Sequence, residues 1–259
     1  MLSPIDYYIL KIFKNINTGE VKFKTKIINR LDFLYALSKA KVPLLKITLI
    51  PGETKELFFQ SIAKKLDINY TKLLNAYNND APYLEASIIP DTYFIPKKMN
   101  EKKLIHFLLK SSHPVYRKIF KNYGIENNRT KQLQILIIAS IIQKESANKK
   151  EMPVVASVIY NRLKKNMRLQ MDGTLNYGKY SHIKVTSKRI KTDTSHFNTY
   201  KHKGLPNYPI GSVSKEAINS AFAPANTNYL YFMRNSQGVH DFSKTFKAHK
   251  KNIRKVKFR

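Results

Sequence analysis

Residues 133–146 read Leu-Gln-Ile-Leu-Ile-Ile-Ala-Ser-Ile-Ile-Gln-Lys-Glu-Ser, and they contain the longest apolar run of the chain. This run predicts a long helix over residues 131–146. A second helix is predicted over residues 153–165, because Pro153 suits the first helical position and apolar residues follow it at helical spacing. We expect the second half of the chain to be a mixed α+β domain built around the first of these helices.

Glu145 stands near the end of the predicted helix and is the strongest candidate for chemistry. It follows Ile141 by four residues and Ile138 by seven, so the three side chains share one helix face. A carboxyl on an apolar face is desolvated, which raises its pKa toward the value that a general acid needs. A surface carboxylate at a frayed helix end, beside Lys144 and Lys149, is the alternative, and periodicity alone does not exclude it.

Other polar residues are weaker candidates. Asp172 precedes a glycine, which is typical of a turn, although it could be a second carboxylate beside Glu145, as in glycosidases that use water. His240 and His249 are nine residues apart, which fits no helical metal motif, so we interpret them as structural or polar-network residues. Ser146 has no nearby His that would make it a nucleophile.

The composition limits the classes of function. The chain has 259 residues, no Cys and a net charge of +30, and only nine of its 47 basic residues are Arg. Disulfides and thiolate metal sites are excluded. An anionic polymer partner would suit the charge, but scattered Lys also fits a Lys-rich composition, and we expect no nucleic-acid partner. The apolar run is too short to span a membrane, which takes about 20 residues.

The first half predicts a strand–helix–helix–strand unit. Residues 1–43 precede it and predict short strands and a helix at 30–41. Asn69 and Thr71 can cap the second helix of the unit. After residue 166, more than 40 residues show little regular pattern, which is uncommon in a compact domain unless the segment is functional. The predicted elements of the unit and of the C-terminal region are strands at 47–50, 93–96 and 229–233, a turn at 51–54, and helices at 56–66, 72–78 and 214–222.

The unit around the turn is similar to a LysM module. In such modules a Gly-Glu/Asp-Thr turn, here Gly52-Glu53-Thr54, opens the first helix, and an Ile-Pro, here Ile95-Pro96, ends the last strand. LysM modules bind the glycan strands of peptidoglycan and chitin. The resemblance implies a LysM-like architecture at residues 46–97, and sugar binding by this unit is left open.

Several motifs in the same order resemble those of the endolytic murein transglycosylase family, also called MltG or YceG-like. The first of them, Ala139–Ser146, looks like the catalytic helix, whose Glu is the family's single catalytic carboxylate. The chain departs from the family pattern at Ser146 (usually Thr), Gly173 (commonly Pro), Phe197 (Tyr) and Asn207-Tyr208 (Pro-Gly). The other matching stretches are residues 89–93, 155–163, 167–172, 197–200, 204–206, 209–210, 229–232, 238–243 and His249.

The resemblance implies a lytic transglycosylase that cleaves the bond between N-acetylmuramic acid and N-acetylglucosamine in peptidoglycan glycan strands. Glu145 would act as the acid and then the base, leaving 1,6-anhydro ends, with endolytic action linked to ending nascent strands. No metal or other cofactor is implied. The substrate-binding candidates from the matching stretches are Ser146, Asn161, Gln170, Asp172, Asn198 and Tyr200.

The resemblance also implies a place in the bacterial envelope. The family has an N-terminal anchor in the inner membrane and a catalytic part in the periplasm, and cell-wall synthesis proteins are the partners that it suggests. The chain shows no such anchor, so we expect a soluble part cut after it. We expect an α+β fold with an N-terminal α/β segment at 1–45, a LysM-like βααβ subdomain at 46–97 and a catalytic domain at 98–259. The alternatives are a lysozyme-like hydrolase that uses Asp172 as well, and a non-catalytic wall-binding protein.

Overall fold

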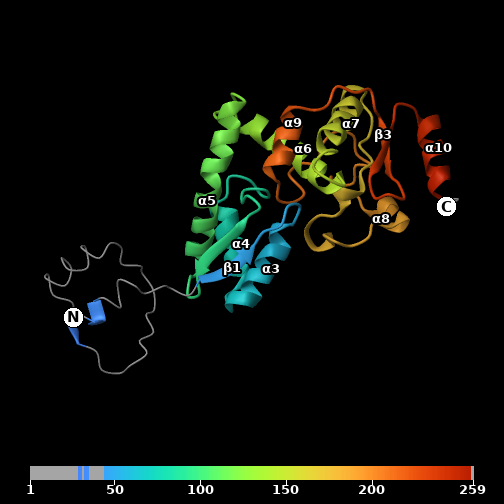
Figure 1. Ribbon diagram of the computed structural model, residues 1–259. Coiled ribbons are helices and arrows are strands. Elements are labelled where there is room, and N and C mark those ends of the chain that lie inside the picture. Colours follow the sequence, from blue (N-terminus) through green and yellow to red (C-terminus); the bar gives the residue numbers. More distant parts are fainter. Residues whose placement is uncertain (1–28, 31, 35–43, 258–259) are drawn as a thin grey trace. The chain divides into compact units, whose positions relative to one another are not determined.

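The computed structural model describes residues 29–30, 32–34 and 44–257 (Figure 1). The predicted N-terminal segment at 1–45, with its helix at 30–41, lies almost entirely outside the described residues. Contacts divide the chain into two compact units, one of residues 1–47 and 93–99 and the other of residues 48–92 and 100–259. The second unit carries Glu145 and the elements that surround it.

The described residues form a mixed α+β fold, as predicted. Strands β1 and β2 form one two-stranded sheet, and β3 and β4 pair antiparallel in another, with Tyr231 opposite Ser243. In chain order the elements are β1 (Leu44–Thr48), α3 (Lys55–Leu66), α4 (Tyr70–Asp80), β2 (Thr92–Pro96), α5 (Glu101–Asn122), α6 (Arg129–Glu145), α7 (Met152–Lys164), the 3-10 helices η1 (Asp172–Leu175) and η2 (Gly178–Tyr180), α8 (Ser187–Thr192), α9 (Lys215–Phe222), β3 (Tyr231–Arg234), β4 (His240–Ser243) and α10 (Phe246–Lys257).

The order β1, α3, α4, β2 is the predicted strand–helix–helix–strand order. Asn69 caps α4 as expected, since its side chain accepts a hydrogen bond from the N–H of Lys72 at 3.0 Å. The strand predicted at 47–50 was misplaced, because β1 ends at Thr48. The likeness of this segment to a LysM module stays a prediction, as do the domain boundaries at 45 and 97.

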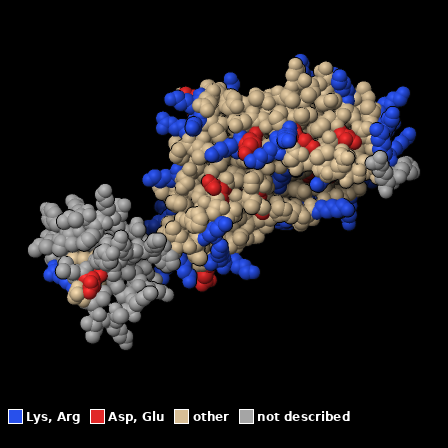
Figure 2. Space-filling view, in the orientation of Figure 1, with Lys and Arg blue, Asp and Glu red and all other residues tan. Residues whose placement is uncertain are grey.

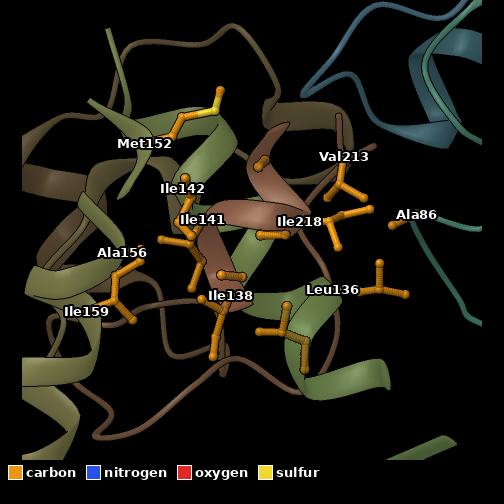
Figure 3. Close-up of a cluster of buried hydrophobic side chains, with 14 of the residues drawn as sticks. Ala86, Leu136, Ile138, Ile141, Ile142, Met152, Ala156, Ile159, Val213 and Ile218 are labelled. Atoms are coloured by element: carbon orange, nitrogen blue, oxygen red, sulfur yellow. The ribbon is translucent and has the colours of Figure 1, made fainter. Parts of the chain in front are cut away.

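Helix α6 is the centre of the hydrophobic core (Figure 3). All residues from Leu136 to Ile142 are buried, so this part of the helix is covered on every side, as expected of a stretch that is apolar almost all round. It packs against α7 and α9, where Ile159 and Ile218 are fully buried. The side chain of Asn128 caps its first turn by accepting from the N–H of Lys131. The helix predicted at 131–146 is thus confirmed, with its start two residues earlier.

Two loops far apart in sequence meet near the end of α6. The N–H of Gly52 donates to the carbonyl of Ser212 at 2.9 Å, and the N–H of Ser212 donates to the carbonyl of Glu53 at 2.8 Å. The hydroxyl of Ser212 donates to the carbonyl of Ile50 at 2.9 Å. The N–H of Leu49 still donates to the carbonyl of Asp91 at 3.0 Å, and from Ile50 onward backbone groups of the turn pair with the second loop instead.

The C-terminal elements β4 and α10 were not predicted. The four residues of β4, His-Asp-Phe-Ser, include no β-branched residue, and α10 is mostly Lys and Arg with few apolar positions. Basic side chains are spread over the visible face with acidic ones among them, rather than gathered in one patch (Figure 2). Among the described helices, none combines the length and the hydropathy needed to cross a membrane.

The meeting of the two loops depends on a glycine, which gives a test of the fold. A Cβ at Gly211 would lie 2.6 Å from the carbonyl oxygen of Gly52. We expect Gly211→Ala to lower the free energy of unfolding by about 1–3 kcal/mol, as overpacking does, in urea denaturation. Asn207→Ala, at an exposed site of the same loop, is the control and should change it by less than about 0.5 kcal/mol. Equal effects of the two variants would contradict the close approach.

Candidate active site

Glu145 is the last residue of α6, and its carboxyl is held by a loop glycine. Its Oε1 accepts a hydrogen bond from the N–H of Gly173 at 2.6 Å. A Cβ at position 173 would lie 2.7 Å from this oxygen and 2.9 Å from the Cβ of Lys144, so only glycine allows the approach. Oε2 has no hydrogen bond to any residue that the structure describes. The neutral carboxyl would therefore carry its proton on Oε2.

The surroundings of Glu145 favour its neutral form. Desolvation by burial is the largest effect and raises the pKa of Glu145 to about 7. The N–H of Gly173 opposes this rise because it stabilises the charged form, whereas the nearby carboxylate of Asp172 adds to it. Arg162 and Lys144 lower the pKa by smaller amounts. Near neutral pH a large fraction of the carboxyl is thus protonated, which is the state that a general acid requires.

A cavity of about 500 Å³ opens beside Glu145. This volume is within the usual range for small-molecule sites. Its walls come from the end of α6, the loop at η1, the turn that leads into α3, and the β3–β4 hairpin. The side chains that line it include Gln143, Lys144, Ser146, Asp172, Asn176, Ser181, His182, Arg234 and His240.

The loop that carries Gly173 is fixed by a buried arginine and a buried threonine. The guanidinium of Arg162 donates from Nε to the carbonyl of Leu230 at 2.6 Å and from Nη1 to that of Leu169 at 2.7 Å. The hydroxyl of Thr199 accepts from the N–H of Met171 at 3.1 Å. These bonds set the backbone of the loop just before it reaches Glu145.

Asp172 and Tyr200 form a pair at the cavity wall. The phenol of Tyr200 donates to Oδ1 of Asp172 at 2.6 Å. Burial, with the hydrogen bond and the charge of Asp172, raises the pKa of Tyr200 above its usual value, so the phenol stays protonated. Asp172 is exposed and lines the cavity that Glu145 lines. The structure therefore brings these two predicted candidates together with Glu145.

The two predicted asparagines have their side-chain amides occupied. Asn198 is fully buried, and its Nδ2 donates to the carbonyls of Ile190 and Asp193 at 2.9 and 2.7 Å. Asn161 donates to the carbonyls of Thr227 and Tyr229. Neither lines the cavity, so in this structure both support the backbone around it rather than face a ligand. A role for either asparagine in substrate binding stays a prediction.

Gln170 and Ser146 have different positions. The side chain of Gln170 is exposed and outside the cavity lining, and its backbone lies in the left-handed region with φ of 49°. Its N–H donates to the carbonyl of Thr199 at 3.1 Å. Ser146 caps the C-terminus of α6 and lines the cavity, and its buried Oγ has no partner within the part of the chain that is described. A role for either residue in substrate binding remains a prediction.

The structure adds His240, which the sequence analysis took as a structural or polar-network residue. The ring Nδ1 of His240 lies 2.7 Å from Oε2 of Glu151, and the backbone N–H of His240 donates to Oε1 of Glu151 at 2.9 Å. Glu151 also accepts from the N–H of Ala147, just after α6. His240 is thus part of a polar network, as expected, and it also lines the cavity. His249 stacks on Tyr231 with a centroid distance of 5.4 Å, away from the cavity lining.

Within residues 29–30, 32–34 and 44–257 there is no group of three or more His, Asp or Glu side chains that could hold a metal ion. The chemistry that these residues offer is proton transfer by one neutral carboxyl. Oxygen donors and acceptors on the cavity wall can orient a polar ligand beside it.

Burial of Glu145 should be measurable as a pH-dependent loss of stability. Its pKa rises on folding from 4.5 to about 7, so ionisation disfavours the folded state. The resulting loss in the free energy of unfolding is absent below about pH 4.5, grows between pH 4.5 and 7, and is constant above pH 7. We expect Glu145→Gln to be more stable than the wild type at pH 8 by about 1–3 kcal/mol, after allowing for partial exposure, but not at pH 4.

Urea denaturation at pH 4, 6 and 8 measures this difference. Glu126→Gln removes an exposed carboxylate and should show no such dependence on pH. A stability difference for Glu145→Gln that stays the same at all three pH values would show that its carboxyl is not desolvated.

Comparison with known proteins identifies the family. The YceG-like family model matches residues 5–255. The endolytic murein transglycosylase of Bacillus subtilis (strain 168) is 33% identical over 199 residues, which cover 76% of this chain and 54% of that protein. The protein of the same name from Streptococcus pneumoniae serotype 2 is 30% identical over 180 residues, covering 66% of this chain and 32% of that protein.

A solved structure agrees with the sequence comparisons. The crystal structure of a YceG-like protein from Listeria monocytogenes aligns with a TM-score of 0.69 and 25% identity, covering 95% of this chain and 88% of that chain. The chain spans about half the length of the Bacillus relative and about a third of the Streptococcus relative. With the family model matching nearly its whole length, the chain belongs to the YceG-like family.

Proposed function

We propose that this chain is a lytic transglycosylase of peptidoglycan, and that Glu145 is its catalytic acid and base. The observation that carries the proposal is the carboxyl of Glu145, which lines a cavity of about 500 Å³ and whose pKa is raised by burial to about 7. The names of the Bacillus and Streptococcus relatives support the reaction class. The same proposal places the protein at the bacterial cell envelope, where peptidoglycan is found.

The reaction proceeds in two proton transfers through one group. The proton on Oε2 of Glu145 moves to the glycosidic oxygen as the bond from that oxygen to C1 of N-acetylmuramic acid breaks. The 6-hydroxyl of the same sugar attacks C1, and its proton passes to Glu145. A 1,6-anhydro ring and a free 4-hydroxyl result, with no water consumed. Alternation between acid and base is the normal cycle of such a carboxyl.

The other cavity residues have supporting roles in this proposal. The N–H of Gly173 holds Oε1, which keeps the protonated Oε2 directed at the substrate. The carboxylate of Asp172, held by Tyr200, lies where it can stabilise positive charge on the reacting sugar ring. Endolytic action is part of the proposal and rests on the names of the relatives. A link to nascent strands is also proposed, from the family resemblance alone.

A hydrolase is the second candidate, and Asp172 is the observation that favours it. It lines the same cavity as Glu145, and an exposed carboxylate there could activate water. In that case the products would have reducing ends rather than anhydro ends.

Product analysis distinguishes the two reactions. We expect purified glycan strands treated with the protein to give anhydro-ended fragments, lighter by one water than reducing-ended ones, by mass spectrometry. Glu145→Gln should give none, since Gln cannot donate a proton, and should remain folded because Gln can still accept from Gly173. Asp172→Asn should retain anhydro products at a lower rate. Reducing ends from the wild type, lost in Asp172→Asn, would establish the hydrolase instead.

The pH dependence of kcat/KM tests the assignment of Glu145 independently. The free enzyme must hold its proton, so kcat/KM should be constant below the pKa of about 7 and fall about tenfold per pH unit above it. The measurement is the initial rate at substrate concentrations well below KM between pH 5 and 9. A profile without a basic limb in this range would exclude a general acid with this pKa.

A further inference from the structure

A second cavity lies next to the catalytic one, in the long loop segment that the sequence analysis singled out as functional. Its volume is about 670 Å³. The lining of the catalytic cavity includes Asn176, and the lining of the second cavity includes its chain neighbours Leu175 and Tyr177. It is formed by η2, by α8 and by the segment after α8. The aromatic and charged side chains that line it are Tyr177, Lys179, Tyr180, Arg189, Asp193 and Phe197.

Arg189 is the unusual group in this cavity. Its guanidinium lies 3.7 Å from the ring centroid of Tyr180, as in cation–π stacking. Nη2 donates to the carbonyl of Leu175, the last residue of η1. Nη1 is buried and, within the described part of the chain, has no hydrogen-bond partner. A buried donor without an acceptor costs free energy, so a ligand oxygen at Nη1 would be favoured.

The charges of the cavity suit a single carboxylate. Asp193 neutralises Arg189 only in part, because its Oδ2 is 3.6 Å from Nε while its Oδ1 accepts from the N–H of Ser195. Lys179 adds a second cation above Tyr180 at 5.2 Å. The two cations, Arg189 and Lys179, exceed the one anion, Asp193, by one charge, so a ligand with one negative charge would neutralise the group. Arginine is the side chain best suited to bind a carboxylate.

The remaining wall is aromatic. The rings of Tyr177 and Phe197 stack with centroids 4.4 Å apart, and Tyr208 meets both edge-on. Such a surface accepts apolar groups, and with the cations it suits an amphiphilic anion rather than a free inorganic ion. Peptidoglycan carries such a group beside every second sugar, namely the carboxylate of the stem peptide.

We infer that this second cavity is a subsite for a stem-peptide carboxylate of the glycan strand, with Arg189 as its recognition residue. The inference rests on the proposed function, because it assigns the neighbouring cavity to the scissile sugars. Occupation of the subsite would also anchor η1 through Leu175. That helix begins with Asp172 and Gly173, the residues next to the carboxyl of Glu145.

The test compares two forms of one substrate. Peptide-bearing glycan strands are used as isolated, or after their peptide carboxyls have been converted to amides with carbodiimide and ammonia. The wild type should cleave the untreated strands with a kcat/KM about 10- to 100-fold higher, which is the loss expected for one charge-assisted hydrogen bond. In Arg189→Gln this ratio should fall to near one. Lys188→Gln, which removes an exposed cation from the same helix, should keep the wild-type ratio.

The ratio is insensitive to a general folding defect, because such a defect lowers both rates alike. An equal loss on both substrates in Arg189→Gln would overturn the subsite and leave Arg189 as a support of Leu175. A wild type that cleaves both substrates equally would overturn it as well.

Failure of the proposed function would look different, because the wild type would then leave reducing ends, as a hydrolase does, or cleave neither substrate. In that case, titration calorimetry with a soluble muramoyl peptide and its amidated form still decides the matter. Tighter binding of the free carboxylate by the wild type but not by Arg189→Gln supports the subsite, and equal binding of the two forms excludes it.

Discussion

The hydrogen bond between the N–H of Gly173 and Oε1 of Glu145 is the constraint on which the site depends. It joins the end of α6, whose middle is buried, to the 3-10 helix η1, 28 residues later. The bond forms only because position 173 has no side chain, since a Cβ would overlap the carboxyl. The packing of α6 fixes one partner, and the backbone of η1 must then be placed within hydrogen-bond distance of it. Much of the surrounding structure can be understood as meeting that requirement.

Backbone carbonyls and amides, rather than pairs of side chains, do most of this placing. The guanidinium of Arg162 donates to the carbonyl of Leu169, in the loop before η1, and to that of Leu230, just before β3. Asn198 and Asn161 bind carbonyls in the same way. Glu151 receives three hydrogen bonds, two from His240 and one from the N–H of Ala147, and so ties the β3–β4 hairpin to the end of α6. Buried polar groups satisfied like this hold a loop in one arrangement.

This pattern explains what could be predicted from the sequence. Helix α6 and the desolvation of Glu145 follow from local periodicity, since Ile138 and Ile141 are buried on its face. The matched motifs placed Asp172 and Tyr200 near it. The hydrogen bonds of Asn198 and Asn161 could not be predicted, because a sequence motif does not tell whether a side-chain amide binds a ligand or a backbone carbonyl. The approach of Gly173 and the exposure of His240 to the cavity arise from contacts between distant segments, which periodicity does not report.

The neighbouring Lys144 shows which electrostatic effect controls the site. If attraction between opposite charges prevailed, the pKa of Glu145 would fall and that of Lys144 would rise. The opposite holds: burial raises the first to about 7 and lowers the second to about 8. Desolvation therefore outweighs the attraction between the two charges, consistent with Lys144 directing its ammonium to the carbonyl of Asn176 instead of the carboxyl. A chain with a net charge of +30 can thus keep its central carboxyl protonated near neutral pH, because the local loss of water matters more than the distant lysines.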